Sequence, residues 1–355
     1  MNILVLTKRF SSGKDYVNDD FGREMRLSEE LQKNGNSITI AAADYHKMER
    51  AKLKMHGMDV RVLPFSIPRL PFFIAETSLL AIKKKANAIL AMGDPILGGA
   101  GYIVSLITSK PLIYDLRDNY EAYETIKKPG VRFLHKRAIA RAKAITAVSS
   151  ILANRIKGKN VHVLGNGVNM KLFRPIDKNY CRKIFGLPKK ATIISYMGGI
   201  EQRGIGDLVE VFKELEKKNK NLKLFLMGKF SHIKGKNIIT HGPIPYEKLP
   251  YPIGAMDVMV IPYRVTPFTE VMYTPYKLVD FMACNKTIVC TDVGEMKKLL
   301  PKELVCNPED KEALKKAILK ALSYRKINHR KTLEEKGLTW EKLGKKLNWI
   351  ISEAV

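Results

Sequence analysis

The sequence TIISYMGGIEQRGIGDLVEVF, residues 192–212, contains an apolar run, a glycine-rich turn and an amphipathic segment in that order. This order predicts a buried strand followed by a helix, the repeating unit of parallel α/β sheets. Backbone N–H groups at such a turn and the positive end of the helix dipole suit a phosphate, and Arg203 adds a permanent charge. The spacing is neither GxGxxG nor a Walker motif, so a tight structural turn with a solvated arginine explains the local pattern equally well.

Short apolar runs alternate with amphipathic segments along the rest of the chain, which is typical of α/β domains with parallel sheets. In the first half we expect strands over residues 3–7, 37–42, 59–63, 88–91, 112–115, 145–148 and 161–164. In the second half we expect them over residues 192–196, 222–227, 238–240, 257–261, 287–290 and 304–306. The clearest helix covers residues 21–33 and ends at Asn34-Gly35, a normal helix stop.

The stretch GNGVNMKLFRP, residues 165–175, separates the two series and contains turn residues and a proline. We place the domain boundary there, since 355 residues also exceed the size at which a single core stops growing. The prediction is two Rossmann-like, doubly wound domains over residues 1–166 and 167–335, facing across a cleft at the carboxyl ends of their strands. Residues 336–355 form a terminal helix that can pack back toward the first domain.

Cysteine use and hydropathy indicate a folded protein of a reducing compartment. The four cysteines, Cys181, Cys284, Cys290 and Cys306, show no CxxC pair or metal-ligand spacing and are expected to be small buried residues. The first apolar run, residues 2–7, is too short for a signal peptide. The longest nearly apolar stretch, residues 95–108, is too short to cross a bilayer, so we expect a cytoplasmic protein.

The formal net charge of +27 suggests an anionic partner: nucleic acid, an anionic membrane or a phosphorylated substrate. Residues 125–159 contain ten lysines and arginines and no aspartate or glutamate. Apolar residues recur there at Phe133, Ile139 and Ala140, so one helix face can pack while the other stays cationic. This pattern suits docking on an anionic lipid surface, but a solvated face of a generally basic protein explains it too. Residues 64–73, PFSIPRLPFF, fit a lipid or acceptor contact and an interior loop equally well.

The segment YTPYKLVDFMA, residues 273–283, predicts a helix with Thr274 as its N-cap and Pro275 at its first position. Lys277 then lies in the first turn, where the helix dipole disfavours a cation. An anionic ligand would remove this conflict. A surface pair between Lys277 and Asp280 is the alternative explanation.

These segments together resemble the family-four retaining glycosyltransferases. Residues 163–169, VLGNGVN, followed by Phe173, are similar to the family's crossover between domains, and the turn at residues 198–208 resembles its diphosphate loop. Residues 275–283, PYKLVDFMA, resemble its donor-binding helix, and residues 339–341, TWE, its last-helix signature. Residues 144–149 match more loosely. The resemblance covers nearly the whole chain and implies the GT-B fold.

The resemblance also assigns site residues. It implies that Arg203 and Lys277 are catalytic, because they would stabilise the negative charge on the departing β-phosphate. The residues that it implies for donor binding are Gly198, Gly199, Glu270, Thr274 and Asp280. On the acceptor side they are Asn18, Asp19, Arg117 and Asp118. The family's chemistry implies retention of configuration, a nucleoside-diphosphate sugar as donor substrate, no cofactor and no metal ion, since positive side chains take the metal's place.

The chain departs from the family pattern at several positions, among them Arg203 in place of a lysine and Asn18-Asp19 in place of a glycine pair. Gly199 stands where the family usually has an arginine, Met272 stands eight residues before Asp280 where it has an acid, and Arg117 stands where many members have a histidine. These departures favour one alternative, a relative that binds nucleotide sugars without transferring them. A basic nucleic-acid-binding protein is a second alternative, although we find no stacking platform or binding motif. We expect a glycosyltransferase that acts on a lipid-linked or envelope glycan, peripheral on the inner membrane face, with no nucleic-acid partner.

Overall fold

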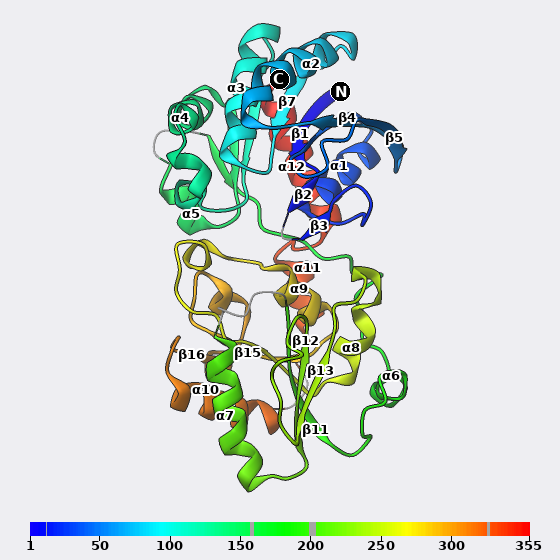
Figure 1. Cartoon of the computed structure of the whole chain (residues 1–355), viewed down its shortest axis with the longest axis vertical. Coiled ribbons are helices and arrows are strands. Elements are labelled where there is room, and N and C mark those ends of the chain that lie inside the picture. Colours follow the sequence, from blue (N-terminus) through cyan, green and yellow to red (C-terminus); the bar gives the residue numbers. More distant parts are fainter. Residues whose placement is uncertain (12, 157–159, 199–203, 325–326) are drawn as a thin grey trace. The chain divides into compact units, whose positions relative to one another are not determined.

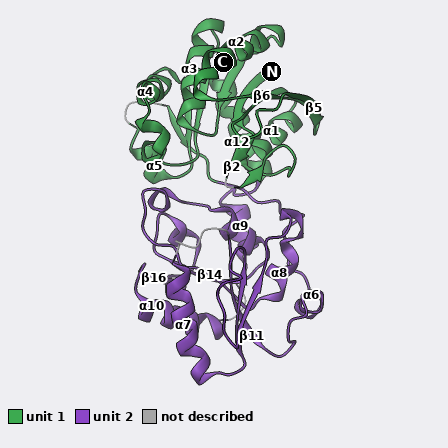
Figure 2. Cartoon of the chain, viewed as in Figure 1, with its two compact units in different colours: residues 1–165, 340–355 green, residues 166–339 purple. Residues whose placement is uncertain are grey.

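The computed structural model describes the chain except residues 12, 157–159, 199–203 and 325–326. It consists of two compact units, each described here by itself (Figure 2). Unit 1 comprises Met1–Gly165 together with Trp340–Val355, and unit 2 comprises Asn166–Thr339.

Unit 1 contains an eight-stranded sheet with the order β10-β9-β8-β7-β1-β4-β6-β5, in which neighbouring strands are parallel except for the β5–β6 pair. The strands are β1 (Asn2–Lys8), β4 (Ser37–Asp44), β5 (Ala51–Met55), β6 (Met58–Pro64), β7 (Ala88–Ala91), β8 (Leu112–Leu116), β9 (Ala144–Ala147) and β10 (Val161–Val163). A small antiparallel hairpin, β2 (Phe10–Ser11) with β3 (Lys14–Asp15), follows β1.

The strand order of unit 1 reverses between β1 and β7, so right-handed crossovers place its helices on both faces of the sheet. On one face, α1 (Arg23–Lys33) packs against α12 (Trp340–Ala354). A Cβ at Gly344 of α12 would lie 2.2 Å from the Cβ of Glu30, so only glycine allows these helices to approach so closely. On the other face α2 (Leu70–Lys83), α3 (Pro95–Thr108) and α4 (Val131–Arg141) pack side by side, followed by the short α5 (Ser150–Asn154) (Figure 1).

A fully buried ion pair joins α1 to β8, and the same arginine binds the last residues of the segment Met1–Gly165. The Arg23 guanidinium donates to both carboxylate oxygens of Asp115 on β8, at 3.0 and 2.8 Å. It also donates to the carbonyls of Leu164 and Gly165, at 2.8 and 2.6 Å. Thr146 donates a further hydrogen bond to Asp115. Arg23 therefore fixes the backbone that leads into unit 2.

Unit 2 contains a six-stranded, all-parallel sheet with the order β13-β12-β11-β14-β15-β16. Its strands are β11 (Thr192–Met197), β12 (Leu222–Met227), β13 (Ile238–His241), β14 (Val258–Ile261), β15 (Thr287–Thr291) and β16 (Val305–Cys306). Its helices are α6 (Lys178–Ile184), α7 (Ile205–Lys218), α8 (Pro250–Ala255), α9 (Tyr276–Ala283), α10 (Lys311–Leu322) and α11 (His329–Glu335). The order reverses between β11 and β14, and ligands of such sheets bind at the carboxyl ends beside this switch point.

The structure confirms the predicted strands to within about two residues at each end and the helix that ends at Asn34-Gly35. The hairpin β2–β3 and the edge strand β5 were not predicted, because β5 reads AKLKM and is largely exposed. The predicted packing face of α4 is wrong: Phe133 and Ala140 are exposed, and Val131, His135 and Ala138 are buried instead. The four cysteines are buried and form no disulfide bonds. Among the described residues, no helix has the length and hydropathy needed to cross a bilayer.

Candidate functional site

The switch point of unit 2 holds a lysine between two tyrosines. Lys277 lies in the first turn of α9, and its ammonium group donates to the Tyr196 hydroxyl of β11 at 3.2 Å. Its Nζ atom is 4.3 Å from the centre of the Tyr196 ring and 5.1 Å from that of Tyr263, which follows β14. Burial lowers the pKa of Lys277, but the Tyr263 and Tyr196 oxygens outweigh this effect and the pKa is raised, so the side chain stays cationic.

The Lys277 charge has no carboxylate partner in the part of the chain that the structure describes. The alternative of a surface pair with Asp280 is wrong, because Asp280 is 3% exposed and accepts a hydrogen bond from Tyr246 at 3.0 Å. A cation without an ion-pair partner at the start of a helix opposes the helix dipole. An anion bound there would stabilise both the lysine and the N–H groups of the first turn.

Gly198 is the residue that the structure brings together with Lys277. A Cβ at Gly198 would lie 2.5 Å from the Lys277 Nζ atom and 2.8 Å from the Tyr196 hydroxyl, so a larger residue would displace the ammonium group. Gly204, at the start of α7, has a φ of +82°, and its Cβ would meet the Pro262 carbonyl at 1.8 Å. Gly199 and Arg203 lie outside the described residues.

Thr274 has a different role from the predicted helix cap. Helix α9 begins at Tyr276, and Pro275 takes the N-cap position without a side-chain hydrogen bond, so the prediction of Thr274 as N-cap and Pro275 as first helical residue is wrong. The buried Thr274 hydroxyl accepts from the backbone N–H of Asn166 at 2.5 Å, and the Thr274 carbonyl accepts from the Asn166 side chain at 2.9 Å. The start of α9 is therefore fixed to the first residue of unit 2.

Glu270 lies on the loop between β14 and α9, in a 3-10 turn that covers Thr269–Val271. The loop is held to the next one, since the N–H of Glu295 donates to the Met272 carbonyl at 2.7 Å. Gly294 makes this approach possible: its φ is +60°, and its Cβ would lie 2.2 Å from that carbonyl oxygen. Glu270 itself is half-buried.

The pKa of Asp280 is raised well above its usual value because the carboxyl group is buried, although the Tyr246 hydrogen bond lowers it. The folded protein therefore holds a proton on Asp280 at pH values where the unfolded chain, with an ordinary pKa near 3.8, has lost it. This difference makes the Asp280 contribution to stability decrease as the pH rises above about 4.

We expect the free energy of unfolding of Asp280→Asn, minus that of the wild type, to increase with pH by up to about 1.4 kcal/mol per pH unit above about pH 4. The reason is that only the wild type has the carboxyl group whose contribution to stability decreases as the pH rises. The unfolding of unit 2 can be measured separately, because all four cysteines are buried in it. Samples are equilibrated in urea at each pH and then labelled at their thiols in a pulse at one fixed pH. A difference that stays constant between pH 4 and 8 would contradict the raised pKa.

The carboxyl edge of the unit 1 sheet holds Arg117 in a fixed network. Its guanidinium donates to Glu24 of α1 at 2.6 Å, to the Tyr16 hydroxyl at 2.7 Å and to Ser11 at 2.8 Å. Burial lowers the pKa of Arg117, but Glu24 and the tyrosines Tyr16, Tyr120 and Tyr123 together outweigh this effect and the pKa is raised. Arg117 therefore anchors the β2–β3 hairpin to α1.

The other acceptor-side residues lie near this network. Asp118 accepts hydrogen bonds from the Asn119 N–H at 2.8 Å and the Tyr123 hydroxyl at 3.2 Å. Asn18 and Asp19 are exposed on the turn after β3 and hydrogen-bond to Asp15 at 2.9 Å each. Asn18 and Asp19 thus lie on the outside of the turn whose Tyr16 contacts Arg117.

Sequence reasoning missed a polar cluster in the middle of this edge. Lys8, the last residue of β1, pairs with Asp94 at 3.2 Å, and Asp94 also accepts from the Tyr45 hydroxyl at 3.1 Å. The Lys8 ammonium lies 5.7 Å from the centre of the Tyr123 ring. The available signal was position: Lys8 and Asp94 each follow a predicted strand by one to three residues, where ligand-facing side chains gather.

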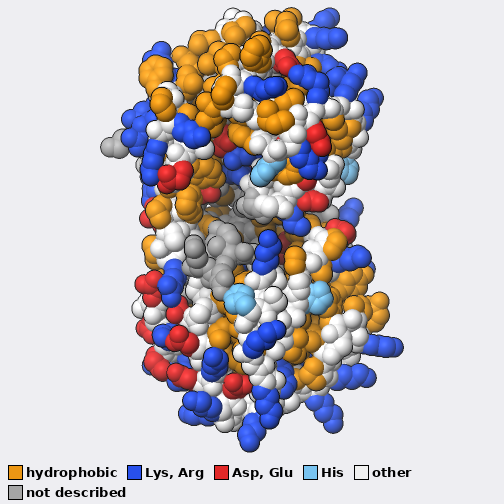
Figure 3. All heavy atoms as spheres, in the orientation of Figure 1, with side chains coloured by type: hydrophobic (Ala, Val, Ile, Leu, Met, Phe, Trp, Pro, Cys, Tyr) orange, Lys and Arg blue, Asp and Glu red, His pale blue; other side chains and the backbone are white. Residues whose placement is uncertain are grey.

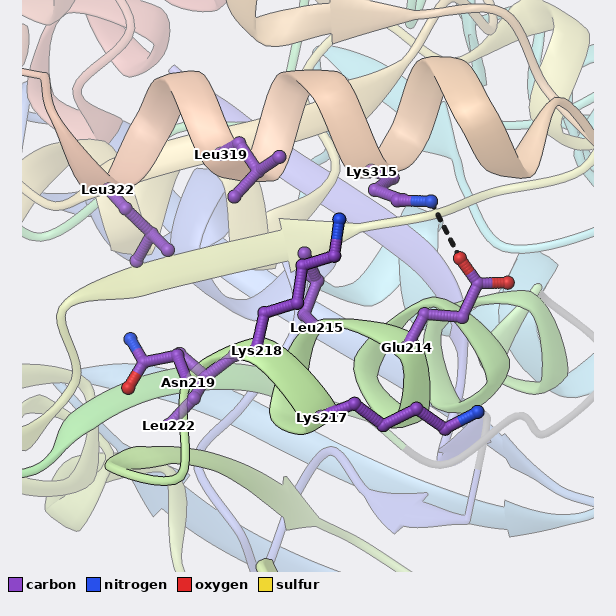
Figure 4. A pocket seen from close by; sticks show the side chains of 9 residues that line it. All are labelled: Glu214, Leu215, Lys217, Lys218, Asn219, Leu222, Lys315, Leu319 and Leu322. Carbon is purple, nitrogen blue, oxygen red and sulfur yellow. Dashed lines mark hydrogen bonds and ion pairs between the residues drawn. The ribbon is translucent and has the colours of Figure 1, made fainter.

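Unit 2 has a shallow groove of about 280 Å³ between the end of α7 and α10 (Figure 4). Leu222, the first residue of β12, lines it together with Leu215 and Leu319, and Lys315 crosses it to Glu214 at 2.7 Å. Because β12 starts there, the groove lies at the amino edge of the sheet, opposite to the Lys277 site. Within the described residues, no group of three or more His, Cys, Asp or Glu side chains is placed to hold a metal ion.

Comparison with known proteins identifies both halves of the chain. The family model "Glycosyltransferase Family 4" matches residues 25–172, and "Glycosyl transferases group 1" matches residues 191–324. The chain is 28% identical over 230 residues to a Bacillus subtilis protein named as a teichuronic acid biosynthesis glycosyltransferase, TuaC, covering 62% of this chain and 57% of that protein. It is 29% identical over 163 residues to the capsular polysaccharide biosynthesis glycosyltransferase CapM of Staphylococcus aureus, covering 42% and 43%. The chain thus spans about half the length of these relatives.

Solved structures share the fold over whole chains. Sucrose-phosphate synthase from Thermosynechococcus elongatus superposes with a TM-score of 0.79 at 17% identity, covering 99% of this chain and 98% of that one. HepE of Anabaena, solved in complex with UDP, gives 0.73 at 16% identity, covering 99% and 100%. The two parallel-sheet units thus have the GT-B architecture. With one family model on each unit, the chain belongs to the family-four, group 1 type of glycosyltransferases.

Proposed function

We propose that the protein transfers a sugar from a nucleoside-diphosphate sugar to a hydroxyl acceptor, with retention of configuration at the anomeric carbon. The observation that carries the proposal is the cation of Lys277, which lies beside Gly198 at the start of α9 without an ion-pair partner among the described residues. A diphosphate is an anion of the right kind for this position. HepE has been solved with UDP and with UDP-glucose, which supports the same ligand class for this chain.

In this mechanism the bond between the anomeric carbon and the β-phosphate oxygen breaks. The acceptor oxygen bonds to the same face of the sugar and passes its proton to the departing β-phosphate oxygen. Lys277, Arg203 and the first turns of α7 and α9 would stabilise the charge that develops on the leaving diphosphate. Tyr196 and Tyr263 would hold the Lys277 ammonium group in position. Asp280 would accept a hydrogen bond from a ribose hydroxyl, and Glu270 would face the sugar.

We propose a lipid-linked or envelope glycan as the acceptor, at the carboxyl edge of the unit 1 sheet. The names of TuaC and CapM, which refer to teichuronic acid and capsular polysaccharide synthesis, support this class. Asp118, Asn18 and Asp19 offer acceptors and donors for sugar hydroxyls. Lys8 and Asp94 add a charged pair in the middle of the same edge.

A panel of UDP-, GDP- and ADP-sugars tests the donor. Incubation with each sugar, with and without a lipid extract as acceptor, should release the free nucleoside diphosphate from one of them. Tight binding of a nucleotide sugar without any release, with or without acceptor, would instead support the non-catalytic relative. Binding of oligonucleotides in preference to every nucleotide sugar would support the nucleic-acid alternative.

We expect the turnover to be unchanged in EDTA, because Lys277, Arg203 and two helix ends supply the positive charge that a divalent ion would otherwise supply. The measurement is the rate of nucleoside diphosphate release before and after chelation, with a metal-dependent glycosyltransferase as the parallel control. Loss of activity in EDTA that Mg²⁺ or Mn²⁺ restores would overturn this prediction.

A further inference from the structure

Helix α2 of unit 1 is apolar on both of its faces. Its inner face buries Phe73, Ile74 and Ala81 against the rest of the unit. Its outer face presents Phe72, Leu79 and Ile82, whose exposed fractions are 70, 67 and 61%. Positions 72, 79 and 82 lie on one stripe of a helix, where a water-exposed helix normally carries polar residues.

The apolar surface continues over the two neighbouring helices. Helix α3 packs between α2 and α4, and its last turn exposes Leu106 and Ile107 at 45 and 56%. On α4, Phe133 is 63% exposed. Figure 3 shows hydrophobic side chains gathered over the end of unit 1 where α2 and α3 lie in Figure 1. We call these six exposed apolar residues and the helices that carry them the α2–α4 surface.

Basic side chains surround this surface, and acids are nearly missing from its helices. Exposed cations on or beside the three helices include Arg69, Lys83, Lys85, Arg132, Lys136, Arg137, Arg141 and Lys143. The sequences of α3 and α4 contain no acid, and the one acid of α2, Glu76, pairs with Arg50 at 2.7 Å. The Arg137 guanidinium lies 5.8 Å from the centre of the Phe133 ring, so a cation and an exposed ring share one position.

We infer that the α2–α4 surface docks on an anionic lipid bilayer, with its apolar side chains in the headgroup region and its lysines and arginines over the lipid phosphates. An apolar stripe flanked by cations matches such an interface in both chemistry and charge. A nucleic acid would leave Leu79, Ile82 and Ile107 unburied. A second copy of this surface would place the same cations against each other, which charge repulsion opposes.

This inference does not depend on the proposed donor or acceptor. The sequence-based expectation placed lipid on the cationic face of residues 125–159, with residues 64–73 as a further alternative. The centre of the surface proposed here is the α2 stripe, which begins within residues 64–73. Charge alone would give binding that salt abolishes, whereas apolar insertion adds a contribution that salt does not screen. Fluorescence and mutation can separate these two contributions.

The first experiment is co-sedimentation of the full chain with vesicles of phosphatidylcholine, or of phosphatidylcholine mixed with phosphatidylglycerol. We expect binding to the anionic vesicles only. Leu79→Ser/Ile82→Ser should weaken it by at least about tenfold, the scale for removing two apolar side chains from the interface. Leu319→Ser, an exposed leucine on α10 of unit 2, is the matched control and should bind as the wild type does.

The second experiment places a dye at the surface. The native cysteines are buried, so Leu79→Cys can be labelled selectively with an environment-sensitive fluorophore, and Leu319→Cys serves as the control. We expect a blue shift with anionic vesicles for the first position only. Equal binding of the double variant and the wild type, or no shift at position 79, would overturn the inference. So would a dimer in light scattering that Leu79→Ser/Ile82→Ser makes monomeric without any vesicle binding by the wild type.

Discussion

Lys277→Met is expected to lower kcat/KM for glycosyl transfer by about a hundredfold or more, the scale of losing one charge-stabilising donor at a reacting centre. Methionine keeps most of the length and the apolar stem of the side chain but removes the ammonium group, which donates to Tyr196 and lies over the Tyr196 and Tyr263 rings. In the proposed mechanism, the charge that builds up on the leaving diphosphate then loses one of the cations that stabilise it. Initial rates of nucleoside diphosphate release measure the effect.

The fold should survive this change, because no carboxylate of the described part of the chain pairs with this half-buried charge and none is left unpaired by its removal. Lys213→Met, at an exposed position of α7 in the same unit, is the control and should keep wild-type activity. Arg203→Ala is expected to show a loss of the same order. If purified Lys277→Met and Arg203→Ala variants both turn over near the wild-type rate, the diphosphate does not bind at this edge of unit 2.

The sheets could be predicted from the sequence because most of their strands are buried on both faces and consist of continuous apolar runs. Prediction from the sequence failed for β5 and for the packing face of α4, because the burial of their residues does not follow from residue type. The lysine-rich strand β5 pairs antiparallel with β6 at the sheet edge, where the polar side chains face solvent. On α4 the buried positions include His135, whose ring bonds to Tyr114 at 2.9 Å, while Phe133 is exposed. Neither choice could be read from hydrophobic periodicity.

The candidate site was predictable in its charge but not in its partners. The conflict between Lys277 and the helix dipole pointed to an anion. Its neighbours could not be predicted, because Tyr196 lies on β11 and Tyr263 just after β14, and these strands meet only in the folded sheet. Arg117 looked available to a ligand in the sequence. In the structure its guanidinium donates hydrogen bonds to Ser11, Tyr16 and Glu24, which lie about 100 residues away in the sequence.

Arg23→Met is expected to destabilise unit 1 by about 3–5 kcal/mol, because it leaves the fully buried Asp115 carboxylate without its cation. It also removes the donors that satisfy the carbonyls of Leu164 and Gly165. Both tryptophans of the chain, Trp340 and Trp349, belong to unit 1, so tryptophan fluorescence in urea reports the unfolding of this unit separately from unit 2. The free energy of unfolding is the quantity to compare.

Two variants separate the burial of the charge from the loss of packing. Arg50→Met breaks the exposed pair with Glu76, at side-chain exposures of 60 and 38%, and should change stability by no more than about 1 kcal/mol. The double variant Arg23→Met/Asp115→Leu removes both buried charges. It should be more stable than Arg23→Met alone, since it no longer buries a carboxylate without a cation. If Arg23→Met costs no more than Arg50→Met, the buried network of Arg23 contributes little to the stability of unit 1. If Arg23→Met is costly but the double variant is no more stable than the single one, Arg23 stabilises unit 1 through its carbonyl contacts and packing rather than through the ion pair. The Leu164 and Gly165 contacts would then be the part of the network that holds the chain leading into unit 2.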